Sequence, residues 1–137
     1  MRRYPVDTGP LAALLQGRPA TVSLLTPWLT AYAVATSIVV YGEVVEYLKA
    51  RADFSAHHAA LRILLGDVYP YFLTYRILEC YADIRRQLRP PHGPGLIGDM
   101  DTLIAATALE RNLTLVTHDT DFQRVPNLQV VLLSRRN

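Results

Sequence analysis

Aspartates stand on both sides of a helix–strand segment near the end of the chain, GDMDTLIAATALERNLTLVTHDTDF over residues 98–122. Asp99 and Asp101 precede an apolar run with helical spacing, and Asp119 and Asp121 follow a short β-rich run. A helix that leads directly into a strand returns the chain to the same side of a sheet, so the two pairs can converge. Converging carboxylates repel one another and need a cation, which predicts a site for a hard metal ion.

Two further acids take comparable places upstream. Asp7 ends the β-like segment Tyr4–Asp7, and Glu43 lies one or two residues into the helix expected after the apolar strand Val34–Val40. In parallel α/β folds, ligands gather at the carboxyl ends of the strands. Four carboxylates without a His/Cys cluster favour Mg²⁺ or Mn²⁺ over Zn²⁺. Such ions activate water and neutralise phosphate charge, so the predicted reaction is phosphodiester hydrolysis.

The upstream acids and the histidine each have a structural alternative. Asp7 suits a helix cap, because it precedes a Gly-Pro helix start. Glu43 competes with Glu46, three residues on and able to share its helix face, and we place Glu46 on the surface. His118 can serve as a general base, but a lone histidine in a turn is more often a turn residue.

The downstream pairs divide between metal ligand and helix cap. We favour Asp101 over Asp99 and Asp119 over Asp121 as ligands, because one member of a pair can cap while the other points at a metal. Asp99 and Asp121 remain as caps or reserve ligands.

Strand-like and helix-like segments alternate along the chain, and these elements must position the acids. The expected strands are Tyr4–Asp7, Val34–Val40, Val68–Leu73, Leu113–Thr117 and Leu128–Leu133, the last one at an edge. The expected helices are Pro10–Gln16, Thr21–Tyr32, Tyr41–Arg51, Ser55–Leu65, Thr74–Leu88 and Thr102–Arg111, with Asn112 as a left-handed cap and a loop at Arg89–Gly98. Strands separated by helices predict a parallel, mostly buried sheet with right-handed crossovers.

Composition sets wider limits on the class of protein. The chain has 137 residues, half of them hydrophobic, which predicts one domain over residues 1–137 with a substantial core. No apolar run reaches membrane-spanning length, and Pro5, Asp7 and Pro10 interrupt the basic and apolar start too early for a signal peptide. We therefore expect no membrane association and a cytoplasmic location. The single cysteine, Cys80, excludes an internal disulfide.

The basic residues are almost all arginines. Lys49 is the sole lysine among 14 basic residues, and the net charge is +2. Clusters occur at Arg2–Arg3, at Arg85–Arg86–Arg89 and at Arg135–Arg136. A basic rim around an acidic, metal-loaded centre would suit a nucleic acid, although a GC-rich genome explains the arginine bias equally well.

Three segments in order carry a family resemblance over nearly the whole chain. They are VDTGPLAALL, SIVVYGEVVEYL and IGDMDTLIAATALERNLTLVTHDTDFQRVPNLQVV. The chain resembles a PIN domain, specifically the VapC-type toxin ribonucleases of toxin–antitoxin pairs. The resemblance implies a three-layer α/β/α fold with a central, mainly parallel sheet.

The same resemblance implies a metal-dependent endoribonuclease with catalytic acids Asp7, Glu43, Asp101 and Asp119. In this reading Asp7, Asp101 and Asp119 bind Mg²⁺ or Mn²⁺, and Glu43 orients or deprotonates the attacking water. The hydroxyls of Thr8 and Thr117 would hydrogen-bond the acids or the waters of the metal. The resemblance also implies a VapB-like antitoxin partner, an RNA substrate and a homodimer.

The chain departs from the family pattern in three places. Gly9 stands where many relatives carry Asn, and Asp99 is an extra carboxylate beside Asp101. The last turn is short, which leaves open whether Asp119 or Asp121 is the fourth acid.

Other classes of protein share fragments of these motifs. Asp7-Thr8-Gly9 is also found in aspartic proteases, but here a helix-like run follows it. Asp99-Met100-Asp101-Thr102 resembles the start of haloacid-dehalogenase-type phosphatases, but that motif belongs after the first strand of a domain. A catalytically silent PIN-type module that binds RNA or protein is the serious alternative.

Overall fold

The strands of the computed structural model, which describes residues 1–134, pair only in parallel. Strand β1 (Tyr4–Pro5) pairs with β2 (Val34–Ser37), β2 with β3 (Tyr69–Tyr71), and β4 (Thr114–Thr117) with β5 (Gln129–Leu132). A parallel bridge between Val6 and Val116 joins the two groups, supported by a hydrogen bond of 2.9 Å from Asp7 N to Val116 O. The strand order is therefore β3-β2-β1-β4-β5.

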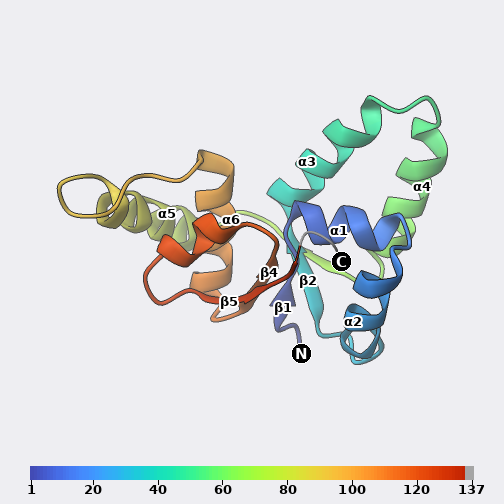
Figure 1. Ribbon diagram of the computed structural model, residues 1–137, viewed down its shortest axis with the longest axis horizontal. Coiled ribbons are helices and arrows are strands. Elements are labelled where there is room, and N and C mark those ends of the chain that lie inside the picture. The colour runs from blue at the N-terminus through green and yellow to red at the C-terminus, as the bar shows by residue number, and fades with distance from the viewer. Residues whose placement is uncertain (135–137) are drawn as a thin grey trace.

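Helices cover both faces of these strands. They are α1 (Thr8–Leu15), α2 (Pro19–Thr30), α3 (Ile38–Lys49), α4 (Phe54–Leu64), α5 (Tyr75–Leu88), α6 (Asp99–Glu110) and the short 3₁₀ helix η1 (Thr120–Arg124). Figure 1 shows α1 to α4 on one side of the strands and α5 and α6 on the other. Right-handed crossovers explain this, because the chain steps one way from β1 to β3 and the other way from β3 to β4. The predicted three-layer α/β/α fold is confirmed.

The core lies between these layers and is built mostly from branched aliphatic side chains. Val34, Val44, Leu115 and Phe122 are fully buried. Helix α6 instead buries small residues, Ala105, Ala106 and Ala108, which allow it to approach its neighbours closely. Within residues 1–134, no helix is long and apolar enough to cross a membrane.

The predicted strand Val34–Val40 is wrong in its second half. Strand β2 ends at Ser37, whose hydroxyl accepts a hydrogen bond of 3.0 Å from Val39 N and caps helix α3. An apolar β-branched run is compatible with a buried strand or with a helix, and here the serine cap decides. As a result Glu43 lies in the second turn of α3 rather than at its start.

The last long helix also starts earlier than predicted. Helix α6 begins at Asp99, with Gly98 at the N-cap position and no capping side chain, so Asp99 and Asp101 both lie inside its first turn. At the other end, Asn112 has a φ of 57° and adopts the predicted left-handed conformation.

Candidate active site

The predicted acids lie around the boundary between β1 and β4, where successive strands stop being added on one side of β1 and start being added on the other. Asp7 follows β1, Asp119 follows β4, and these two strands are neighbours at the centre of the sheet. Helix α6 contributes Asp101 and helix α3 contributes Glu43. Such a boundary, at the carboxyl ends of parallel strands, is where ligands bind in open α/β sheets.

Electrostatic coupling shows that the acids of different elements are neighbours. Burial raises the pKa of Asp101 to about 6, followed by repulsion from Asp7, Asp119 and Glu43 and, last, from Asp121. Burial also raises the pKa of Asp7, opposed by a hydrogen bond from Thr117 and reinforced by the charges of Glu43 and Asp119. The structure therefore brings the four preferred acids into one electrostatic cluster.

Asp7 is held by the neighbouring strand and does not act as a cap. Its side chain occupies the N-cap position of α1 but makes no capping hydrogen bond. Instead, Thr117 Oγ1 donates to Asp7 Oδ2 at 2.7 Å, and both side chains are buried. The hydroxyl of Thr117 thus orients a carboxylate that is 110 residues away in the sequence.

Glu43 is oriented in the same way by a threonine of another helix. Thr8 Oγ1, at the start of α1, donates to Glu43 Oε1 at 2.7 Å. Glu43 is half-buried, whereas Glu46 is exposed. Both predicted threonines therefore contact acids directly.

Asp119 is itself a helix cap, which differs from our assignment of the cap to its neighbour. Asp119 Oδ1 accepts a hydrogen bond of 2.9 Å from Asp121 N and caps η1. Its own backbone N–H donates to Thr117 Oγ1 at 3.0 Å. Asp121 turns to Arg124, at 3.1 Å. A cap bond uses one carboxylate oxygen and leaves the second available, so capping and metal binding are compatible at Asp119.

Asp99, unlike Asp119, does not act as a helix cap. Its side chain is 70% exposed and forms an ion pair of 2.6 Å with Arg85 of α5. Asp101, two residues further along α6, lies instead near the other acids. The two members of this pair therefore face different neighbours, which sequence spacing alone could not reveal.

A close contact between α1 and the loop after β4 was missed at the sequence level. A Cβ atom added to Gly9 would lie 2.8 Å from His118 Cδ2, so only glycine fits there without a shift. His118 Nδ1 lies 3.3 Å from the carbonyl oxygen of Leu133. The expectation of a turn position for His118 agrees with its place after β4. Gly9 in the segment VDTGPLAALL is the sequence feature that could have indicated this contact.

Two of the three arginine clusters lie within the described residues, and one member of each makes a defined contact. The guanidinium of Arg2 donates to the carbonyls of Val34 and Asp67, both at 2.7 Å, and ties together the amino ends of the strands. Arg85 is paired with Asp99. Arg135 and Arg136 lie outside the described residues.

Comparison with known proteins identifies the fold and the family. The PIN domain family model matches residues 4–128, a range that contains all the candidate acids. The chain belongs to the PIN domain family. Ribonuclease VapC1 of Haemophilus influenzae strain R2866 is 26% identical over 128 residues, covering 92% of this chain and 94% of the relative.

Solved structures share this PIN fold. VapBC2 from Rickettsia felis, bound to a DNA fragment from its promoter, has a TM-score of 0.82 at 24% identity, covering 94% of this chain and 97% of that chain. VapBC-1 from nontypeable Haemophilus influenzae has a TM-score of 0.79 at 24% identity, covering 98% of both chains. The likeness extends over nearly the whole domain.

The donor set of this PIN domain fits a hard cation in its chemistry. It consists of carboxylate oxygens with hydroxyls behind them, and two of the carboxyls have pKa values raised by burial and mutual repulsion. A divalent ion relieves that repulsion and prefers oxygen ligands. Among residues 1–134, no three His, Cys, Asp or Glu side chains already form a group that could hold a metal ion.

Proposed function

We propose that the chain is a metal-dependent endoribonuclease and the toxin of a type II, VapBC-like toxin–antitoxin system. The observation that carries this proposal is the coupling of Asp7, Glu43, Asp101 and Asp119 where β1 and β4 end. The similarity to Ribonuclease VapC1 over 92% of the chain supports RNA as the substrate.

Three of the four acids share one role in this proposal. Asp7, Asp101 and Asp119 would hold Mg²⁺ or Mn²⁺, with Asp99 turned away to Arg85 and Asp121 turned to Arg124. When bound, the ion supplies positive charge that stabilises the charge developing on the phosphate.

Glu43 would orient or deprotonate the attacking water. Thr8 donates to its Oε1, so Oε2 remains for the water, and the hydrogen bond fixes the plane of the carboxylate. Thr117 would hold Asp7 in position and oppose the rise in its pKa caused by burial, since a hydrogen bond to the charged form favours that form.

The same proposal includes partners and a location. Solved relatives are described as VapBC complexes from Rickettsia felis, Haemophilus influenzae and Salmonella typhimurium, which supports a VapB-like antitoxin partner for this chain. Exposed apolar side chains at the start of α5 and before it, including Phe72, Tyr75 and Leu78, support a homodimer. We also propose a cytoplasmic location, where RNA is available.

Cleavage of single-stranded RNA by the purified chain tests this function. We expect cleavage with Mn²⁺ or Mg²⁺ and none with EDTA. In Asp7→Asn and Asp101→Asn the cleavage rate should fall by more than the factor of about 10 to 100 that is typical when a residue behind a metal ligand is lost. Asp83→Asn, at an exposed position on α5, is the matched control. RNA binding without cleavage under any metal would favour the silent module, and cleavage that survives both active-site substitutions would refute the mechanism.

A further inference from the structure

We propose that a recess beside the acids binds one nucleotide of the RNA strand next to the cleaved phosphate, with Tyr47 and Arg18 as its binding residues. This inference rests on the proposed function and extends it to a substrate-binding subsite.

The recess lies beside two residues that border the acidic cluster, Thr8 and His118. It has a volume of about 390 Å³ and is lined by Thr8, Gly9 and His118 at one end and by Gln16, Arg18 and Tyr47 at the other. Thr8 holds Glu43, and His118 immediately precedes Asp119. A ligand in the recess is therefore adjacent to the acids, and the volume lies within the range of small-molecule sites.

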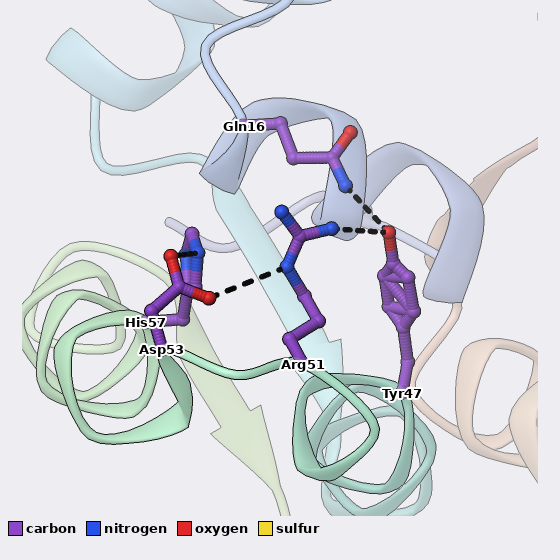
Figure 2. A network of polar contacts seen from close by, with 5 residues as sticks. All are labelled: Gln16, Tyr47, Arg51, Asp53 and His57. Atoms are coloured by element: carbon purple, nitrogen blue, oxygen red, sulfur yellow. Dashed lines mark hydrogen bonds and ion pairs between the residues drawn. The ribbon is translucent and has the colours of Figure 1, made fainter.

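A polar network holds Tyr47 in a fixed position at the far end (Figure 2). Gln16 Nε2 donates to the Tyr47 hydroxyl at 3.0 Å, and Arg51 Nη1 donates to it at 3.3 Å. Arg51 also contacts Asp53 at 3.8 Å, and Asp53 contacts His57 at 2.8 Å. These contacts tie α1, α3 and the start of α4 together around one aromatic ring.

The orientation of the Gln16 amide follows from a third contact. Arg18 Nε donates to Gln16 Oε1 at 3.2 Å, and an arginine N–H can only donate, so the amide oxygen faces Arg18. The amide nitrogen therefore faces Tyr47, whose hydroxyl oxygen accepts two hydrogen bonds. Within residues 1–134 the Tyr47 hydroxyl donates to no partner, so its proton is available to a ligand.

The lining has the chemistry of a nucleotide site. Tyr47 is 41% exposed and offers a ring on which a base can stack together with an O–H donor. The remaining guanidinium nitrogens of Arg18 have no hydrogen bond within the described part of the chain, and a guanidinium pairs well with a phosphate. No acidic side chain lines the recess over residues 1–134. The fixed aromatic ring and the free cation favour RNA over a protein segment.

Cleavage kinetics and RNA binding test the subsite. For a fluorescent single-stranded RNA, we expect Tyr47→Ala to raise the KM for cleavage and the Kd in EDTA by about 10-fold, as for loss of one base–aromatic stack. Tyr47→Phe keeps the ring and should raise Kd by only about 3-fold, the loss of one hydrogen bond. Arg18→Gln should raise Kd and flatten its salt dependence, because one phosphate contact is lost.

Exposed residues that do not line the recess supply the matched controls, Tyr32→Asn and Arg62→Gln, which should leave Kd unchanged. Thermal denaturation checks that each variant folds, and Tyr47→Phe tests the subsite even if Tyr47→Ala is unstable. An unchanged Kd in both Tyr47→Phe and Arg18→Gln would overturn the subsite and leave a protein segment as the occupant of the recess. A wild-type chain that binds RNA through Tyr47 but does not cleave it would refute the proposed function and still support the subsite.

Discussion

At the scale of single residues, one hydroxyl connects the two central strands at the candidate site. Thr117 Oγ1 donates to Asp7 Oδ2 and accepts from Asp119 N. It therefore sets the position of two candidate ligands at once. A threonine directly before the last acidic turn has a structural role that valine, of nearly the same shape, cannot fill.

Thr117→Val tests this role. The substitution leaves Asp7 without its donor and Asp119 N without its acceptor, so we expect a loss of about 1–3 kcal/mol in the free energy of unfolding. Mn²⁺ affinity should fall by about 10-fold or more, as for loss of an outer-shell partner. Urea denaturation and Mn²⁺ titration measure the two effects. Thr107→Val is the control, since its buried hydroxyl donates only to a carbonyl of its own helix; equal effects in both variants would refute the role.

Asp99 and Asp101 are expected to behave differently although they are two residues apart. Asp99 is largely exposed and paired with Arg85, and exposed ion pairs contribute little to stability. Asp99→Asn should therefore keep Mn²⁺ affinity and RNA cleavage within about twofold, a change of less than about 0.5 kcal/mol. Asp101→Asn should abolish both. Isothermal titration with Mn²⁺ and an RNA cleavage assay would decide, and a large loss in Asp99→Asn would make that residue a ligand.

At the scale of elements, sequence periodicity predicted the helices and strands well and their junctions poorly. The run Val34–Val40 contains both a buried strand and the first turn of a helix, and periodicity cannot separate them. The hydrogen bond from Val39 N to Ser37 Oγ marks the junction, because it satisfies a free N–H at the helix start. The placement of Glu43 depends on that junction, so its depth in the helix could not be predicted.

The contact between α1 and the loop after β4 allows a test of how the elements fit. Gly9→Ala would place a Cβ 2.8 Å from His118 Cδ2, so the helix start or the ring must shift. We expect a lower melting temperature and weaker RNA cleavage, since Thr8 and Asp119 flank the contact. In the double variant Gly9→Ala/His118→Ala the clash is gone, so the double-mutant cycle should show recovery of stability. Additive losses would show that the two residues do not oppose each other.

At the scale of the whole molecule, the site depends on the order of the strands. The sequence predicted that acids after strands would meet, since the strands are parallel and their carboxyl ends share an edge. It could not show that β1 and β4 are neighbours, which requires the chain to return past its own start after β3. Nor could it show which neighbour each acid of a pair would contact, because Asp99 pairs with Arg85 of another helix and Asp121 with Arg124.

The burial of Asp101 and the charges of its acidic neighbours should make the stability of the metal-free protein depend on pH. The pKa of Asp101 is about 6 in the folded chain, against about 3.9 for an unfolded aspartate. The folded state therefore keeps a proton that the unfolded state has released, so this residue's contribution to the free energy of unfolding falls as pH rises from about 4 to about 6.

Thermal denaturation in EDTA should show a steeper decline in melting temperature across this pH range for the wild type than for Asp101→Asn, whereas Asp83→Asn should follow the wild type. Mn²⁺ at pH 7.5 should raise the melting temperature of the wild type, because it binds only the folded cluster, and should have a much smaller effect on Asp101→Asn. Identical pH profiles for wild type and Asp101→Asn would mean that neither burial nor the neighbouring acids raise the pKa of Asp101 in the folded protein.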